Sequence, residues 1–336
     1  MDPERAGAWE IEPGLWQLRL PLPWDTISSV NAFAIARDDG RMLVDCGSAG
    51  DPSHLEALSA AMEAAGLRLA DVRLLVVTHT HSDHVGLAAW VIAESGCRFL
   101  MHAASAHFYD AMREPEAIEA ARARRAGREG VPDDLLPGFG DVREELEGVL
   151  EPVDPDEPLR DGMRLPSTLG DWEVLETPGH APSHVCLLQR ERGVAIVGDL
   201  VARAFAPYFD YGYTPDPIGE LLASYDRVES IGGIRLGLPG HGRPLEDLNG
   251  TIAAHRRGIH QRLRDARAAV AAGPAGAYEV RGRMYGEAAS AQTAVWQTSE
   301  VLCYLKHLRD AGDVVRDQNA TGAYSYRLAG APRGGP

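Results

Sequence analysis

Three histidines and an aspartate lie close together in the segment His79-Thr80-His81-Ser82-Asp83-His84. A loop that leaves a strand can turn His79 and His81 toward one point, while Asp83 and His84 face a second point beside it. Imidazole nitrogen and carboxylate oxygen are ligands that suit a borderline divalent cation such as zinc. We therefore predict a metal site here, in preference to four solvated polar residues in a turn.

Three later segments share a pattern in which an apolar run ends in a turn that carries a possible ligand. They are Leu175-Glu176-Thr177-Pro178-Gly179-His180, Ala195-Ile196-Val197-Gly198-Asp199 and Leu238-Pro239-Gly240-His241-Gly242. Their glycines allow the backbone to take unusual angles and to approach a metal closely. Together the segments supply enough ligands for two metal ions with positions left open for water: His79, His81, Asp83, His84, His180, Asp199 and His241.

These segments, preceded by Asp45 in Leu43-Val44-Asp45-Cys46-Gly47, resemble in order the five motifs of the metallo-β-lactamase superfamily, over residues 14–245. The resemblance implies that one metal binds His79, His81 and His180. It implies that the second binds Asp83, His84 and His241, and that Asp199 bridges the two. Asp45 would orient the histidine loop without binding metal, and His184 would pack behind the ligands. The implied fold is an α/β sandwich, αββα, with two mixed sheets, outer helices and the site at one edge.

The same resemblance implies a hydrolase with two divalent metal ions, Zn²⁺ first, with Fe or Mn as alternatives. Asp83, and an aspartate rather than a cysteine at position 199, are similar to the glyoxalase II, lactonase and nuclease branches and unlike true β-lactamases. In such an enzyme a hydroxide shared by two metals attacks a thioester, ester or lactone. Asp83 would then be catalytic, because a free oxygen of this ligand can orient the hydroxide. We predict a small-molecule acyl substrate.

Other activities stay open at this point. Acyl-homoserine lactonases of this superfamily carry a tyrosine three residues after the bridging aspartate, where this chain has Ala202. The persulfide dioxygenases share the HxHxDH pattern yet bind a single iron. A nuclease or nucleic-acid-binding hydrolase that uses a C-terminal winged helix is the other alternative. We predict that the aromatic stretch 205–213 brings Tyr208, Tyr211 and Tyr213 to the substrate pocket, with packing under a long loop as the alternative.

Strand and helix patterns alternate through the first 250 residues, which indicates an α/β core. Strands are predicted over 15–20, 30–36, 42–44, 74–78, 172–175, 185–188, 194–197, 236–239, 314–316 and 324–327, and helices over 52–66, 218–230, 251–272 and 299–311. Residues 104–148 predict a helical insertion, either a lid over the site or a surface helical pair. We predict a catalytic domain over 1–250, a C-terminal α+β domain similar to a winged helix over 251–329, and a disordered tail over 330–336.

Charge is unevenly distributed along the 336 residues, whose net charge is −16. From residue 251 onward the chain carries 12 basic and 7 acidic groups, a net of +5, so the first 250 residues carry −21. An acidic catalytic domain disfavours a nucleic-acid substrate, because neutralising phosphates dominates that affinity. A homodimer formed through the C-terminal domain is a further expectation.

No apolar run reaches the ~20 residues that cross a bilayer. The start of the chain, Met1-Asp2-Pro3-Glu4-Arg5, is charged, so we predict a cytoplasmic protein without a membrane contact. Four distant cysteines predict buried thiols rather than disulfides: Cys46, Cys97, Cys186 and Cys303. The remaining histidines are interpreted as structural or surface residues: His54, His102, His107, His255, His260 and His307.

Overall fold

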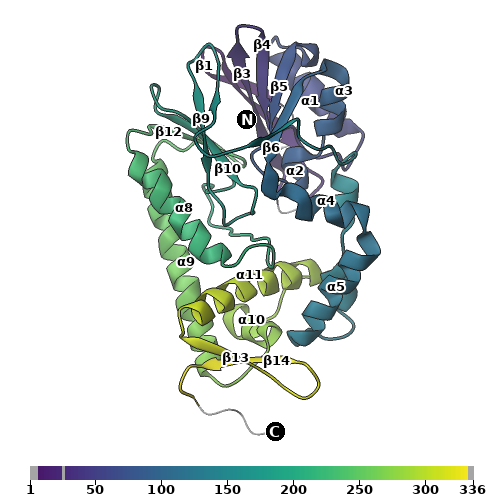
Figure 1. The fold of residues 1–336 in the computed structure, drawn as a ribbon, viewed down its shortest axis with the longest axis vertical. Helices are drawn as coiled ribbons and strands as arrows, with labels where there is room; N and C mark the ends of the chain where they lie inside the picture. The colour runs from purple at the N-terminus through teal and green to yellow at the C-terminus, as the bar shows by residue number, and fades with distance from the viewer. Residues whose placement is uncertain (1–6, 25–26, 332–336) are drawn as a thin grey trace.

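Two β-sheets lie face to face in the computed structural model, which describes residues 7–24 and 27–331 (Figure 1). The first sheet has seven strands in chain order, antiparallel from β1 to β4 and parallel from β4 to β7. Its strands are β1 (Gly7–Glu12), β2 (Leu15–Pro21), β3 (Ser29–Arg37), β4 (Gly40–Val44), β5 (Val72–Val76), β6 (Arg98–His102) and β7 (Glu157–Leu159).

The second sheet has the order β12-β11-β10-β9-β8. Strands β11 and β12 pair in parallel, and the other pairs are antiparallel. Its strands are β8 (Arg164–Leu165), β9 (Trp172–Glu176), β10 (Val185–Gln189), β11 (Val194–Gly198) and β12 (Leu236–Pro239). Both sheets are therefore mixed, as the αββα prediction requires.

Alternation along the strands divides the apolar side chains into layers. In β10, Val185 and Leu187 face the space between the sheets, whereas Cys186 and Leu188 face the helices outside. This two-residue period is that of a pleated strand buried on both faces, which explains why β10 is apolar at most positions. The layer between the sheets also holds Phe33, Met42 and Trp172.

Helices cover the outer face of each sheet. Leu58 and Val91 place α1 (Ser53–Ala64) and α3 (Ala88–Ser95) in the core on the first sheet. Leu221 and Ile252 do the same for α8 (Pro217–Ile231) and α9 (Leu248–Ala271) on the second sheet. Three short helices complete this part of the chain: η1 (Leu69–Asp71), α2 (Ser82–Val85) and η2 (Ala103–Ser105).

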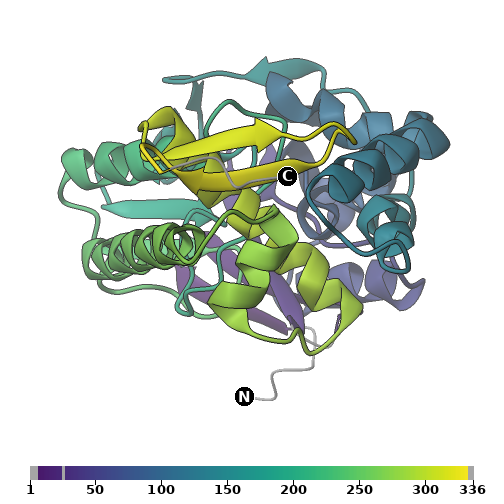
Figure 2. The ribbon, with the colours of Figure 1, turned by 90° about the horizontal axis from the view of Figure 1, so that it is seen from below.

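The helical insertion and the C-terminal elements lie together at one end of the molecule (Figures 1 and 2). The insertion holds α4 (Ala106–Arg113), α5 (Pro115–Arg128), α6 (Leu136–Gly140) and α7 (Arg143–Gly148). The C-terminal elements are α10 (Ala277–Tyr285), α11 (Ala291–Asp310) and the antiparallel pair β13 (Val314–Gln318) and β14 (Tyr324–Leu328). The Tyr326 hydroxyl donates to Glu129 Oε1 at 3.1 Å, which joins the hairpin to the end of α5.

One hydrophobic core spans the second sheet and the C-terminal elements. It contains Leu175 of β9 and Ile218 of α8 as well as Leu305 of α11 and Tyr326 of β14. The C-terminal elements therefore pack directly against the helices and strands of the second sheet. The boundary at residue 250 and the winged-helix assignment stay predictions.

The structure confirms the predicted α/β sandwich and adds elements that were not predicted, among them β1, β6 and α10. All four cysteines are buried free thiols, as predicted. No helix in the described ranges is long and apolar enough to span a membrane. The predictions for the first five residues and for positions 332–336 of the tail fall outside the described residues.

Candidate metal centre

All seven predicted ligands follow the carboxyl ends of strands at one edge of the sandwich. The histidine segment begins after β5, and its last part forms α2, which carries Asp83 and His84. His180 follows β9, Asp199 follows β11 and His241 follows β12. Because β9, β11 and β12 run in the same direction, their ends deliver the three side chains to the same edge.

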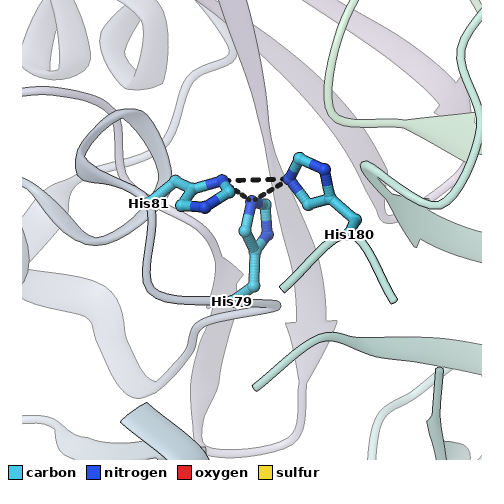
Figure 3. Close-up of side chains that lie close together, drawn as sticks. All are labelled: His79, His81 and His180. Atoms are coloured by element: carbon cyan, nitrogen blue, oxygen red, sulfur yellow. Dashed lines mark hydrogen bonds between the residues drawn. The ribbon is translucent and has the colours of Figure 1, made fainter. Parts of the chain in front are cut away.

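His79, His81 and His180 converge on one point (Figure 3). His79 Nε2 lies 3.1 Å from His81 Nδ1 and 3.2 Å from His180 Nε2, and the last two atoms lie 2.9 Å apart. On their outer sides, His180 Nδ1 faces the Tyr208 carbonyl at 3.0 Å and His79 Nδ1 faces the Thr78 hydroxyl at 3.0 Å. When the outer nitrogens carry the protons, the inner three present lone pairs to one point, an arrangement that a cation satisfies.

Asp83, His84 and His241 form a second cluster beside the first. His241 Nε2 lies 3.2 Å from Asp83 Oδ2, and His84 Nε2 lies 3.5 Å from the same oxygen. Asp199 stands between the clusters, because its Oδ2 is 3.3 Å from His241 Nε2 and 3.6 Å from His180 Nε2. The structure thus groups the seven side chains as the resemblance implied, and their role as ligands stays a proposal.

Unsatisfied buried atoms test whether these residues fit a metal. His84 Nε2 and Asp199 Oδ1 are buried and lie 3.5 Å apart, and neither atom makes a hydrogen bond of good geometry among the described residues. Such groups are costly to leave unpaired, and a bound cation would satisfy both. Gly240 allows the close approach, since a Cβ there would lie 2.2 Å from Asp199 Oδ1 and 2.7 Å from His84 Cε1. The residues present therefore fit the binding of divalent cations.

Asp45 and His184 lie behind the ligands and hold them. Asp45 is buried, and its Oδ2 lies 2.8 Å from His84 Nδ1. His184 Nε2 accepts the backbone N–H of Asp199 at 3.0 Å, so its other nitrogen carries a proton toward the Thr177 hydroxyl at 2.8 Å. Because both His184 nitrogens are engaged, His184 supports Asp199 and is not aimed at the clusters.

The carboxylates of the site raise the pKa of three of its histidines when no metal is bound, namely His81, His84 and His241. Burial lowers the pKa of His81, but Asp210, Asp83 and Asp199 outweigh it and raise this pKa to about 9. Burial also lowers the pKa of His241, but Asp199 and Asp83 outweigh this effect and raise the pKa to about 10. His180 differs, because burial and the neighbouring His81 lower its pKa to about 4. A metal ion would replace the protons on His81 and His241.

A cavity of about 590 Å³ opens beside the first cluster. His81 and Tyr208 lie at the metal end, while Arg122 of the insertion and Trp296 of α11 line its other walls. The insertion therefore forms part of the cavity wall, and its role as a lid stays a prediction. The C-terminal elements supply the facing wall through α11.

The three predicted pocket tyrosines all line this cavity but differ in their surroundings. The Tyr208 ring is 40% exposed and stands 5.3 Å from the His81 ring, centroid to centroid. The Tyr213 ring packs on the ring of His107 at 4.3 Å. Tyr211 lies below the Arg125 guanidinium at 5.6 Å, and burial raises its pKa to about 12. Among the three, Tyr208 is the tyrosine whose ring lies beside histidines of the first cluster.

Asp210 and His107 are the site residues that sequence reasoning missed. Asp210 Oδ1 lies 3.0 Å from His81 Nε2, and its Oδ2 lies 3.1 Å from His107 Nε2. His107, interpreted as a structural or surface residue, lines the cavity. The available signal was Asp210 itself, the one carboxylate within the aromatic stretch 205–213.

The other histidines outside the site behave as structural or surface residues. His54 and His255 are buried, and the His255 ring nitrogen donates to the Ala202 carbonyl at 2.8 Å. His102 pairs with Glu176 and His307 with Asp216, at 3.2 and 2.8 Å. His260 is exposed on α9.

Curated proteins of related sequence include hydrolases from fungi and bacteria. The chain is 25% identical over 248 residues to the lactamase-like protein adaB of Aspergillus niger, covering 73% of this chain and 59% of that protein. It is 25% identical over 280 residues to the probable metallo-hydrolase YqjP of Bacillus subtilis, covering 78% and 82%. It is 21% identical over 241 residues to the atrochrysone carboxyl ACP thioesterase nsrC of Aspergillus novofumigatus, covering 72% and 58%. The chain thus spans under two thirds of the length of adaB and nsrC.

Solved structures resemble the chain over nearly its whole length. A metallo-beta-lactamase family protein of Thermus thermophilus shares 28% identity and a TM-score of 0.81, covering 95% of this chain and all of that one. A beta-lactamase domain protein of Burkholderia ambifaria shares 26% identity and a TM-score of 0.80, covering 96% and 93%. The likeness therefore includes the C-terminal elements.

The family model of the metallo-beta-lactamase superfamily matches residues 25–241, which is more than half of the chain and runs from β3 to His241. This range contains every residue of the two clusters. The chain therefore belongs to the metallo-beta-lactamase superfamily.

Proposed function

We propose that the protein is a dinuclear metal-dependent hydrolase that cleaves a thioester, ester or lactone of a small acyl substrate. The observation that carries this proposal is the pair of clusters that share Asp199 and adjoin a cavity of about 590 Å³. Cavities of this size enclose a small molecule. We propose zinc as the metal, since the ligand set consists of imidazole nitrogens and carboxylate oxygens.

Two divalent cations bound in these clusters would supply Lewis acidity, which activates water and polarises an acyl carbonyl. Asp83 packs against His84 and His241 and would orient the attacking water from the second cluster. Tyr208, which lines the cavity with its ring 5.3 Å from that of His81, would place its hydroxyl beside the acyl oxygen or the leaving group. Asp210 would keep His81 oriented throughout.

Among acyl substrates, a thioester is favoured. A thiolate leaves without protonation more readily than an alkoxide, so a site with little general acid suits it. The related nsrC protein is named as an acyl-carrier-protein thioesterase, which supports the same class. Ala202 stands where the homoserine lactonases place their tyrosine, which argues against that lactone subclass.

The C-terminal elements weigh against a nuclease. Helix α11 lines the cavity through Trp296 and packs in the shared core through Leu305, so two of its faces are occupied within the molecule. We propose that this part of the chain shapes the substrate cavity and does not bind nucleic acid. A gel-shift titration against salt tests this, and specific binding that weakens steeply with salt would contradict it.

Metal analysis combined with a substrate screen tests the proposal. We expect close to two zinc ions per chain and turnover of acyl thioesters in a panel that also holds lactones, oxygen esters and phosphodiesters. His180→Ala and Asp83→Ala should each lower kcat/KM about a thousandfold or more. His260→Ala on the exposed face of α9 is the control and should be unchanged. One iron per chain with oxygen consumption would assign a dioxygenase instead, and full activity in both cluster variants would refute the site.

A further inference from the structure

Asp210 joins two histidines that come from different parts of the chain. Its two carboxylate oxygens face His81 Nε2 at 3.0 Å and His107 Nε2 at 3.1 Å. His81 follows strand β5 in the first cluster, whereas His107 lies in the first turn of α4 in the insertion. All three side chains are mostly buried, with 11–14% of each exposed. One carboxylate therefore connects the candidate metal cluster to the wall of the cavity.

The loop that carries Asp210 is anchored to the cluster by its backbone as well. The Asp210 N–H donates to the His180 carbonyl at 3.2 Å, and His180 Nδ1 donates to the Tyr208 carbonyl at 3.0 Å. Residues 208–210 thus contact two of the three histidines of the first cluster. A change in the position of His81 or His180 must displace this loop.

His107 is held equally firmly on the insertion side. Its Nδ1 faces the Ala104 carbonyl at 3.2 Å, and its ring packs on Tyr213 at 4.3 Å. Because this ring is fixed to α4, its hydrogen bond to Asp210 links the helix to the cluster and restricts the movement of one relative to the other.

We propose that Asp210 is a positioning residue that couples metal binding in the first cluster to the ordering of helix α4 over the substrate cavity. This inference rests on the metal site proposed above. An acceptor at His81 Nε2 keeps the lone pair of Nδ1 directed at the metal, as outer carboxylates do for metal-bound histidines. A bound metal in turn fixes His81 and Asp210, and Asp210 then offers His107 an immobile acceptor. Linkage makes the effect mutual, so that ordering of α4 strengthens metal binding.

Hydrogen–deuterium exchange and metal affinity, measured on the same proteins, test the coupling. In the native protein, Zn²⁺ should slow amide exchange over residues 106–113 about tenfold, within the usual range of coupling between sites. Asp210→Ala should weaken Zn²⁺ affinity about 10–100-fold in a chelator competition and abolish the protection of α4. Asp210→Asn keeps one acceptor oxygen, so its Zn²⁺ affinity and its protection of α4 should lie between those of the native protein and those of Asp210→Ala.

His107→Phe separates positioning from coupling. The phenyl ring keeps the packing on Tyr213 but loses both nitrogens, so Zn²⁺ should no longer protect α4, and Zn²⁺ affinity should fall by about tenfold or less, which is the share that the coupling supplies. His260→Ala is the control, because His260 is exposed on α9 and does not line the cavity. Thermal melts of the metal-free variants establish that each is folded before it is compared.

The outcomes separate this inference from the proposed function. If the native protein binds no metal, the proposed function fails. If the native protein binds Zn²⁺ but Asp210→Ala binds it equally well, or His107→Phe keeps metal-dependent protection of α4, the coupling is refuted while the metal site stands.

Discussion

The Nδ1 atom of His84 lies 2.8 Å from Oδ2 of Asp45, and both side chains are buried. The same carboxylate accepts the backbone N–H and the hydroxyl of Thr78 at 2.7 and 2.9 Å. Asp45 adopts a φ of 60°, in the left-handed region that aspartate tolerates better than most residues. One strained residue therefore fixes both the residue that precedes the histidine segment and the last candidate ligand within it.

Replacing Asp45 with alanine should destabilise the protein even without metal. The Thr78 N–H and the His84 ring N–H would lose their acceptor in a buried place, which costs about 2–5 kcal/mol. Denaturant unfolding in the presence of a chelator measures this loss. Asparagine tolerates the same φ and keeps one acceptor oxygen, so Asp45→Asn should lose less unfolding free energy than Asp45→Ala. Native-like unfolding of Asp45→Ala would show that the carboxylate does not organise the segment.

Metal affinity should rise with pH. Without metal, His81 and His241 have pKa values raised to about 9 and about 10, so both are protonated at pH 7. Binding must expel these protons, so the apparent affinity should strengthen up to about tenfold per expelled proton for each pH unit between 6 and 8. Chelator competition at several pH values, with calorimetry in buffers of different ionisation enthalpy, counts the protons released. An affinity that does not change with pH would contradict this.

Glu129 should make stability depend on pH. Burial raises the pKa of Glu129 from 4.5 to about 7, so the folded protein holds this proton more tightly than the unfolded chain. The resulting stabilisation is complete below pH 4.5 and is lost as the pH rises through 7, which amounts to up to about 3 kcal/mol. Urea unfolding of the metal-free protein at pH 5 and pH 8 should show this loss in the native chain but not in Glu129→Gln. Glu116→Gln, exposed on the same helix, is the control and should keep the native pH dependence.

Trp296 should influence which acyl groups are accepted. Its side chain lines the wall that α11 contributes to the cavity. Trp296→Ala removes apolar contact with a bulky acyl chain, and we expect KM for long or aromatic thioesters to rise about tenfold with little change for an acetyl thioester. An equal change for both substrates would indicate a general disturbance of the fold. An unchanged KM for both would show that α11 does not meet the substrate.

The candidate ligands could be predicted because each follows a buried strand at a fixed and recognisable spacing. Asp210 could not, because its partners His81 and His107 lie 129 and 103 residues away along the chain. These three residues meet only because of the path of the loop 205–213 and the position of α4. Neither of these features produces a pattern of neighbouring residues in the sequence. The start of α11 was missed for a related reason. Gln292 and Thr293 face the cavity there, and such polar residues interrupt the apolar period that indicates a helix.

The core shared by the second sheet and the C-terminal elements has a consequence for biosynthesis. Leu175 and Cys186 are covered on one side by a layer that extends to Leu305 and Tyr326. A ribosome that has added His241 has made every candidate ligand, yet the hydrophobic core that these residues share is incomplete until β14 emerges. Premature termination in the last helices would therefore leave a complete set of ligands in a chain whose apolar core is partly exposed, and such a chain is a substrate for chaperones and proteases.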